Sequence, residues 1–561
     1  MRYSNLFGRS QKTVPSDAQV TSHRYLYQAG FIRRFTTGRW AYLPLGMRVW
    51  EKIYQVIDEE MKNIGCQKVE VPTLHPMDIW NKTDRVEIFG DEMLVVDDHY
   101  RTTFTLGATA EVMMAELVKM FQPSYRDLPI DIYQFSKKFR DDKRPRGALL
   151  RVREFVMKDA YTFAADQEQF QQSYDLFYQA YLKIAEEMDL EVQPVLADSG
   201  AIGGAVSHEF MIESDHGDNT YLVCDQCDYA ANQERADFVR QDKNPKEEVR
   251  DFEIIEQPEW VLTMEDNIKH YGEPKWRYLK NVVYRGSDGK LYIASIRGDQ
   301  DVNETKLAGY LGISSVEPAT EEDLEELGTK HGYVHSWGEK GATYVGDIGL
   351  TKVKNFIGGQ KEEKTDSINV NYGRDFEYEH LADIVNAQDG SLCSECEQGR
   401  LKEKQGYEWG HVFNIGHVYS KPQNCTYTDK NGEEKFLWMG SYGIGLGRCM
   451  ALIAETHHDE NGIIWPEVVA PFKYHLVGLD LHQKKVKEFA EKVYQKLIDR
   501  GEEILFDDRL EISPGEKFAD ADLIGCPYRL VVSSKTLKEK KVEVKKRTEK
   551  ETELVDLKSL A

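Results

Sequence analysis

Hydrophobic and polar positions switch between helical and extended spacing along the first third of the chain. From Trp50 to Ile64, apolar residues recur every three or four positions, which predicts an amphipathic helix. Cys66 to Leu74 alternates like a strand, and 131–139 and 149–157 read as two more strands joined by the basic turn KRPRG. A long helix is predicted over 167–188. This order predicts a mixed core of helices and strands.

The composition changes after Cys227. Between about 228 and 392 the chain is strongly charged, with acidic runs such as KEEVRDFEIIE, and this segment has the size of a domain. Towards the C-terminus a helix over 484–500 alternates with strands over 503–506 and 528–532, which indicates a small α/β domain. We therefore divide the chain into 1–227, 228–392, 393–468 and 469–561.

The charge balance excludes some classes of protein. There are 72 basic and 96 acidic residues, a formal net charge of −24, which argues against indiscriminate nucleic-acid binding. No run of 18 apolar residues occurs and the start has no apolar signal segment, so we expect a cytoplasmic protein without a membrane span. Yet residues 139–163 hold seven Lys or Arg against four Asp or Glu.

That basic segment has two interpretations. Alternation along the second strand puts Arg151, Arg153 and Phe155 on one face, where a ring can stack on a base and guanidinium groups can pair with phosphate. Alternatively, the segment is a solvated hairpin whose basic groups pair with neighbouring carboxylates. The residue spacing alone does not decide between these two interpretations.

The segment resembles motif 2 of class II aminoacyl-tRNA synthetases, and in detail that of the bacterial prolyl family. The helix and strand that end at Pro72, preceded by LPLG, resemble motif 1. GSYGIGLGR, whose glycines from Gly440 onwards predict a turn that runs into a helix, resembles motif 3. The family also carries a large insertion between motifs 2 and 3. The resemblance implies a catalytic core built on the class II antiparallel sheet, an inserted α/β editing-like domain and a C-terminal α/β anticodon-binding domain.

The resemblance also implies roles in ATP binding. Arg140 would hold the α-phosphate and the amino-acid carboxylate, with Arg151 and Mg²⁺ also at the phosphates. Phe155 would stack on adenine, and Arg448 would cover its other face near the γ-phosphate. The family pattern FRDE reads FRDD here, so Asp142 stands where a glutamate is expected to meet the adenine amino group.

Thr109 and Glu111 are candidates for binding the substrate amine. Proline bound as a cation has two N–H donors, and a hydroxyl and a carboxylate two residues apart can accept both. The resemblance assigns them this task and adds His208, His411 and Phe413 as elements of the proline pocket. On sequence alone, Thr109 also fits a helix cap and Glu111 a first-turn carboxylate.

The insertion resembles the family's deacylase domain, which hydrolyses mischarged alanyl-tRNA. Lys280 and Asp299 match its characteristic positions. Three features depart from the family. The family's GPIGL is GDIGL in this chain, and the family's next strand, which carries an aspartate, is missing. The segment GGQKEEKTD holds no histidine where the family has one. We expect a domain that folds but edits weakly or not at all.

Four of the eight cysteines form two CxxC pairs at the ends of this segment, Cys224 with Cys227 and Cys393 with Cys396. Four thiolates at such turns suit a closed structural zinc site. Reduced thiols and disulfides are the alternatives.

The C-terminal segment DDRLEISPGEKFADADLIGCPYRLVV resembles the class IIa anticodon-binding domain, with Arg509 and Lys517 as candidate tRNA contacts. Arg144 and Arg146 in the motif 2 turn are expected near the acceptor end of the tRNA. The family reading implies a homodimeric ligase that activates proline with ATP and transfers it to tRNA(Pro). The rivals are a threonyl or glycyl synthetase and a synthetase-like protein that only binds RNA.

Overall fold

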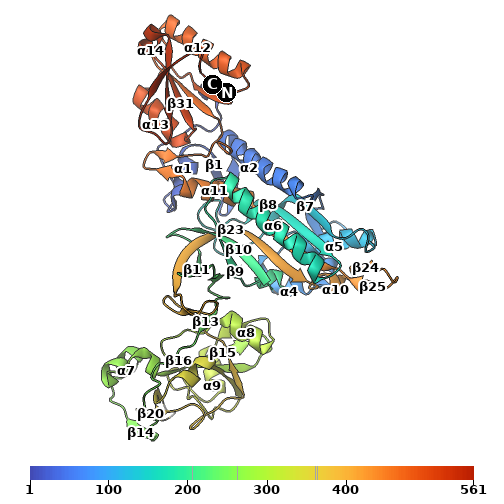
Figure 1. The fold of residues 1–561 in the computed structure, drawn as a ribbon, viewed down its shortest axis with the longest axis vertical. Coiled ribbons are helices and arrows are strands. Elements are labelled where there is room, and N and C mark those ends of the chain that lie inside the picture. The colour runs from blue at the N-terminus through green and yellow to red at the C-terminus, as the bar shows by residue number, and fades with distance from the viewer. Residues whose placement is uncertain (205, 262, 360–361, 363, 561) are drawn as a thin grey trace. The chain divides into compact units, whose positions relative to one another are not determined.

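The chain forms two compact units in the computed structural model, which describes residues 1–204, 206–261, 263–359, 362 and 364–560 (Figure 1). The first unit comprises 1–194, 199–216 and 407–561, and the second comprises 195–198 and 217–406. None of the helices among the described residues combines the length and apolar character that a membrane crossing needs.

The first unit is built on a sheet whose central strands are antiparallel. β26 lies between β8 and β23 and is antiparallel to both, and β7 is antiparallel to β8. The short β3 adds in parallel beside β7, and β10 pairs with β23 at the other side. The bounds are β3 Gln67–Lys68, β7 Ile130–Phe139, β8 Glu154–Ala164, β10 Val206–Glu213, β23 Leu401–Gly416 and β26 Trp438–Gly445.

Three helices cover one face of this sheet: α2 (Pro44–Asn63), α6 (Gln167–Glu187) and α11 (Leu446–Thr456) (Figure 1). Pro44 opens α2, where its fixed φ suits the first turn. The Asp166 side chain caps α6 by accepting from the backbone N–H of Gln169. The helices predicted over 50–64 and 167–188 are confirmed, the first beginning earlier than its pattern indicated.

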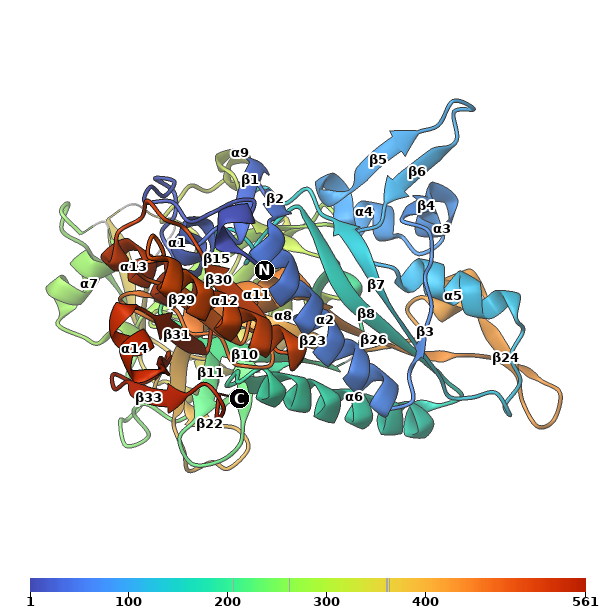
Figure 2. The same cartoon turned by 90° about the horizontal axis from the view of Figure 1, so that it is seen from above.

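The other face carries α5 (Glu111–Met120) and a small sheet in the order β4, β6, β5 (Figure 2). The start of α5 packs through Ala110 and Val112 against Tyr161 and Phe163, which point to this face from β8. The elements around it are α3 Met77–Asn81, α4 Arg85–Phe89, α10 Ser420–Gln423, β4 Leu74–Pro76, β5 Leu94–Asp97, β6 Thr103–Leu106, β24 Thr426–Thr428 and β25 Glu434–Phe436.

Three predicted strand and turn positions are wrong. The strand expected over 149–157 begins at Glu154, because an isolated bridge between Arg146 and Arg151 keeps the preceding residues in the turn. The strand expected from Cys66 shrinks to β3, since only two residues find a partner on β7. The glycine-rich 440–445 is part of β26 and not a turn, because ladders on both sides hold it extended.

The C-terminal part of the first unit is a five-stranded sheet in the order β30, β29, β31, β32, β33, with helices packed against it. β29 pairs in parallel with both β30 and β31, as the predicted α/β domain requires. Its elements are β29 Tyr474–Gly478, α12 Lys484–Asp499, β30 Ile504–Asp507, α13 Pro514–Ile524, β31 Tyr528–Val532, α14 Ser534–Glu539, β32 Lys541–Lys546 and β33 Glu553–Asp556.

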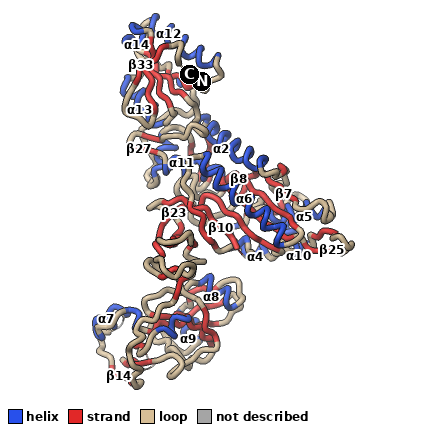
Figure 3. The backbone as a smooth tube through the Cα atoms, in the orientation of Figure 1, coloured by secondary structure: helices blue, strands red, loops and turns tan. Residues whose placement is uncertain are grey.

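Strands and loops predominate in the second unit (Figure 3). It contains its own five-stranded sheet in the order β17, β15, β16, β18, β21 and a smaller sheet in the order β14, β20, β19. Two further pairs, β11 with β12 and β13 with β22, lie in the part of this unit that carries the cysteines. The bounds are β11 Asn219–Cys224, β12 Ala230–Asn232, β13 Phe238–Val239, β14 Glu253–Glu256, α7 Met264–Tyr271, β15 Leu279–Gly286, β16 Leu291–Arg297, α8 Glu304–Leu311, β17 Val316–Pro318, α9 Glu321–Glu326, β18 Ala342–Asp347, β19 Phe356–Gly359, β20 Thr365–Val370, β21 His380–Ala382 and β22 Leu392–Cys393.

Candidate active site

Thr109 and Glu111 come together as a buried acceptor pair at the start of α5. The Thr109 hydroxyl donates to one Glu111 carboxylate oxygen, and Ser441 of β26 donates to the other at 2.8 Å. The helix cap is Ala110, which makes no side-chain capping bond, so Thr109 does not cap α5. Because both oxygens of Glu111 are already oriented, the pair is preorganised to receive N–H donors.

Arg140, Phe155 and Arg448 are brought to one place by the sheet and α11. The Arg140 guanidinium carbon lies 5.6 Å from the centre of the Phe155 ring, and its Nε donates to the carbonyl of Ala108 at 3.2 Å. Arg448, at the start of α11, donates from Nε to the carbonyl of Leu150 at 3.1 Å. Burial lowers the pKa of Arg140, which Glu408 opposes. One ring and two cations therefore share a site.

Glu408 links the arginines to the histidine, and the sequence interpretation missed it. Arg448 donates to its carboxylate at 3.2 Å and to its carbonyl at 2.9 Å, and His411 Nδ1 lies 3.1 Å from its other oxygen. Burial would raise the pKa of Glu408, but the His411 hydrogen bond and the charge of Arg448 lower it to about 2. Its carboxylate is therefore ionised at neutral pH.

Glu209, Glu408 and His411 form a group of potential metal ligands, with one ligand atom of each within 4.8 Å of the others. Nε2 of His411 is buried and has no hydrogen-bond partner among the described residues. Glu209 lies on β10, and its oxygen is 3.8 Å from His411 Nδ1. Strict alternation puts strand residues three apart on opposite faces, so periodicity could not pair Glu408 with His411. The one local cue was Glu209, which directly follows the predicted His208 in the sequence.

The remaining predicted proline-pocket residues lie beside this group. Phe413 stacks on His411 with ring centres 3.7 Å apart. His208 Nδ1 lies 2.7 Å from the Tyr174 hydroxyl, and burial lowers the pKa of His208. Both histidines thus have defined partners and orient the surrounding side chains.

Asp142 is held within the motif 2 turn. Arg151 Nε donates to one carboxylate oxygen at 2.6 Å, the backbone N–H of Arg144 donates to the other at 2.7 Å, and Arg153 Nε donates to the Asp142 carbonyl at 2.8 Å. The side chains of Arg144 and Arg146 are exposed. An adenine contact by Asp142 would have to compete with Arg151.

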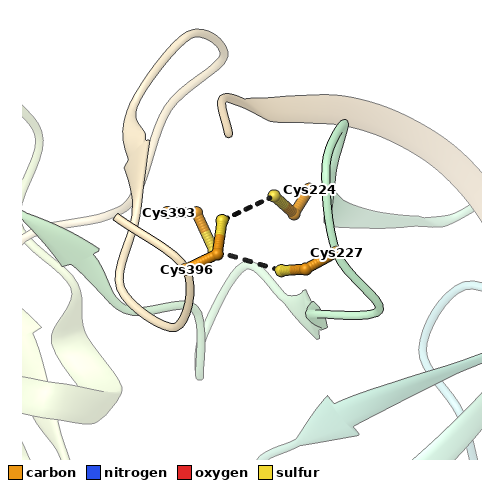
Figure 4. A group of neighbouring side chains, drawn as sticks. All are labelled: Cys224, Cys227, Cys393 and Cys396. Carbon is orange, nitrogen blue, oxygen red and sulfur yellow. Dashed lines mark hydrogen bonds between the residues drawn. The ribbon is translucent and has the colours of Figure 1, made fainter. Parts of the chain in front are cut away.

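The four paired cysteines converge within the second unit (Figure 4). Cys224 Sγ lies 3.7 Å from Cys396 Sγ, and Cys227 Sγ lies 3.8 Å from Cys393 Sγ. Zinc at 2.3 Å from four sulfurs places them about 3.8 Å apart, so these thiols fit a tetrahedral site. Hydrogen bonds from the backbone of Gly399 and Gln398 lower the pKa of Cys396 to about 6. A Cβ on Gly399 would lie 2.3 Å from Cys224 Sγ, so only glycine fits against the cluster.

The editing-like residues are tied to neighbouring side chains. Lys280 on β15 donates to Asp301 at 2.8 Å and to the carbonyl of Gln300 at 3.2 Å. Asp299 accepts two bonds from Arg297, at 2.9 and 2.8 Å. In GDIGL, Asp347 is fully buried and pairs with Arg240 at 3.1 Å. GGQKEEKTD lies partly outside the described residues.

The two candidate tRNA contacts of the C-terminal domain lie in a buried ion network. Arg509 pairs with Asp507 at 2.6 Å and Asp520 at 2.7 Å, and its guanidinium carbon lies 4.0 Å from the Tyr3 ring centre. Lys517 is 3% exposed and donates to the carbonyls of Gly478 and Arg509. This network ties α13 to β30, so the structure gives both residues a supporting role, and their contact with tRNA stays a prediction.

Comparison with known proteins identifies the family. The family described as tRNA synthetase class II core domain (G, H, P, S and T) matches residues 94–457, and the anticodon binding domain family matches 468–561. The proline–tRNA ligase of Persephonella marina is 42% identical over 99% of this chain and 98% of its own length. That of Thermotoga maritima is 40% identical over 100% of this chain and 96% of its own.

The chain belongs to the proline–tRNA ligase family of class II aminoacyl-tRNA synthetases. The fold of this family member agrees with solved structures of more distant proteins. Prolyl-tRNA synthetase from Cryptosporidium parvum aligns with a TM-score of 0.59 at 14% identity, over 99% of this chain and 77% of that one. The Giardia lamblia prolyl-tRNA synthetase aligns with a TM-score of 0.57 at 14% identity, over 95% and 74%. The predicted class II core with a C-terminal anticodon-binding domain is confirmed.

Proposed function

We propose that this enzyme activates proline with ATP to prolyl-adenylate and transfers the prolyl group to tRNA(Pro). The observation that carries the proposal is the juxtaposition of a carboxylate acceptor pair, Thr109 and Glu111, with a ring and two cations, Phe155, Arg140 and Arg448. The first set suits a secondary ammonium group, and the second suits a nucleoside triphosphate. Whole-chain identity to proline–tRNA ligases supports the same assignment.

Activation requires the proline carboxylate to attack the α-phosphorus as pyrophosphate leaves. Glu111 and Thr109 would fix the amine end, and Arg140 would hold the carboxylate and α-phosphate for in-line attack. Arg140 and Arg448 would also spread the negative charge that develops on the phosphoryl oxygens. Phe155 would stack on adenine. These groups position and stabilise, so no covalent bond to the enzyme is needed.

Glu209 and Glu408 fit a magnesium site, because carboxylate oxygens are the ligands this ion prefers. His411 would orient Glu408 through its 3.1 Å contact. The metal, when bound, neutralises phosphate charge that the arginines leave uncompensated. The depressed pKa of Glu408 keeps its carboxylate ionised throughout the neutral pH range.

We assign a structural zinc ion to the cysteine cluster of the second unit. Sulfur separations of 3.7 and 3.8 Å support it, and four protein ligands would close the coordination shell. Such an ion would hold the two CxxC turns together and take no part in the aminoacylation reaction.

The partners follow from the reaction and the family. We propose a homodimer formed through the motif 1 segment, α2 and β3, and action in the cytoplasm, where tRNA and ATP are available. Arg144 and Arg146 would approach the acceptor end of tRNA(Pro) from the motif 2 turn, since both are exposed. Analytical ultracentrifugation measures the subunit number directly.

The deciding experiment is amino-acid-dependent ATP–pyrophosphate exchange. Exchange with proline, and not with threonine or glycine, is the expected result. Exchange with threonine or glycine alone would assign the enzyme to another class IIa specificity. If no amino acid supports exchange in protein that still binds tRNA, the result would favour a synthetase-like RNA-binding protein.

A further inference from the structure

A hairpin near the N-terminus lies directly against the basic motif 2 turn. Its strands are β1 (Ile32–Thr36) and β2 (Arg39–Tyr42). The backbone N–H of Arg153 donates to the carbonyl of Gly38, in the turn of the hairpin, at 2.9 Å. Gly38 has φ +72°, and a Cβ there would lie 2.9 Å from Arg153 Cγ and 3.1 Å from Pro145 Cβ. The two loops therefore form one continuous surface.

Phe35 stands out on this surface because its side chain is 86% exposed. Single exposed apolar residues are common and need no explanation. This ring, however, has Arg34 and Arg39 on its own hairpin and the exposed Arg144 and Arg146 on the adjoining turn. An exposed ring among guanidinium groups is the combination with which proteins bind single-stranded nucleic acid, by stacking bases and pairing with phosphates.

The carboxylates that pair with Arg34 and Lys143 are exposed to solvent. Asp17 pairs with Arg34 at 2.6 Å, and Asp91 pairs with Lys143 at 3.3 Å, but all four side chains are at least 40% exposed. Solvent-exposed pairs of this kind contribute little stability and exchange readily. Asp142 is engaged by Arg151 inside the turn. The surface is therefore locally positive on a chain of net charge −24.

The position of this surface determines which part of a nucleic acid can bind to it. The backbone N–H of Arg140 donates to the carbonyl of Arg153 at 3.0 Å, and Arg153 is the residue that bonds Gly38. The hairpin thus adjoins the phosphate-binding arginine, where an aminoacyl group would be passed to the tRNA. Only an unpaired 3′ end can bring its terminal ribose there, and only unpaired bases can stack on a side chain.

We propose that Phe35 stacks on an unpaired base near the 3′ end of the bound tRNA, while Arg34 and Arg39 hold the adjacent phosphates. The proposal rests on the proposed function, because it takes tRNA as the second substrate. It adds the β1–β2 hairpin to the tRNA-binding surface and gives Phe35 a positioning role in the transfer step.

The test compares two reactions of the full-length enzyme. Phe35→Ala should raise the KM for a tRNA(Pro) transcript about 10-fold, because one stacking contact is lost. It should leave proline-dependent ATP–pyrophosphate exchange, which needs no tRNA, within about twofold of wild type. Phe35→Trp should retain the wild-type KM. Phe121→Ala, which removes another side chain that is 78% exposed, is the matched control and should change neither reaction.

A spectroscopic readout separates stacking from a general loss of fit. A transcript with 2-aminopurine in place of an unpaired 3′ base should lose fluorescence on binding wild type and Phe35→Trp, and not on binding Phe35→Ala. A tRNA KM for Phe35→Ala within twofold of wild type would overturn the proposal. So would a shift of Phe35→Ala from dimer to monomer in sedimentation, since the ring would then serve a subunit interface. Absence of exchange in wild type would instead reject the proposed function, and transcript binding would still test the hairpin.

Discussion

The hydroxyl of Ser441 donates a hydrogen bond of 2.8 Å to Glu111, a residue 330 positions earlier in the chain. Thr109 donates to the other oxygen of the same carboxylate, which is 1% exposed. β26 and the start of α5 therefore hold one ionisable group in a fixed orientation. Such orientation matters for a cationic substrate, because the carboxylate need not reorganise when the amine arrives.

Replacing this carboxylate should affect proline far more than ATP. Glu111→Gln keeps the shape but removes the charge, and we expect the KM for proline to rise about 100-fold, as for the loss of a charge-assisted hydrogen bond. The KM for ATP should change less than threefold. Pyrophosphate exchange at varied proline and ATP measures both. Glu116→Gln, on the same helix, is the control and should leave both unchanged; equal losses for the two variants would contradict the role.

Even a conservative replacement of Arg448 should impair the activation of proline with ATP. Its guanidinium contacts the Leu150 carbonyl and Glu408 from two different nitrogens, which the single ammonium group of lysine cannot reproduce. We expect Arg448→Lys to lower kcat/KM for ATP about 100-fold in pyrophosphate exchange. Arg126→Lys, at an exposed arginine beside Tyr125, serves as the control. An Arg448→Lys enzyme with wild-type kinetics would remove this residue from the ATP site.

The part of the site that the sequence revealed is the part that local spacing encodes. Thr109 and Glu111 lie two residues apart at a helix start, and the spacing of the cysteines identifies the two CxxC turns. Ser441 reaches Glu111 only through the ladder order of the sheet, which no local pattern carries. The pairing of Glu408 with the predicted His411 could not be seen for another reason, because strict strand alternation puts residues three apart on opposite faces. The glycine-rich 440–445 is extended and not a turn because it pairs with two strands from distant segments, which no local pattern of glycines indicates.

Metal analysis tests the cysteine cluster. Purified enzyme should contain about one zinc per chain by mass spectrometry, and Cys227→Ser should lose most of it, because one thiolate ligand is missing. Cys425→Ser is the matched control: Cys425 donates to the carbonyl of Ala115 at 3.3 Å, a bond that serine can keep. Zinc-free protein with four titratable thiols at the cluster would rule the site out.

Editing by the second unit should be weak or absent. Lys280 is paired with Asp301, and the GDIGL aspartate is buried against Arg240. Neither group is positioned as a free participant in hydrolysis. We expect alanyl-tRNA(Pro) to be deacylated by the enzyme at a rate within about threefold of the buffer background. Rapid hydrolysis that Lys280→Ala abolishes would show that the unit is a working deacylase.

His475 should make the C-terminal domain sensitive to acid. The ring is 1% exposed on β29 beside Tyr3, and among the described residues neither ring nitrogen has a hydrogen-bond partner. Burial lowers the pKa of His475 to about 4, although the charges of Asp507 and Asp520 oppose this. The unfolded chain, with a histidine pKa of about 6.5, therefore takes up the proton first as the pH falls.

The resulting contribution to stability is present above pH 6.5 and is lost progressively between pH 6.5 and about 4. At pH 5 the loss amounts to about 2 kcal/mol. His475→Phe removes the titrating group and should flatten the fall in unfolding free energy between pH 7.5 and 5, measured by denaturant unfolding at each pH. His482→Phe, at an exposed histidine on the same domain, should keep the wild-type slope. If His475→Phe and wild type lose stability in parallel, the buried ring is not the acid-sensitive group.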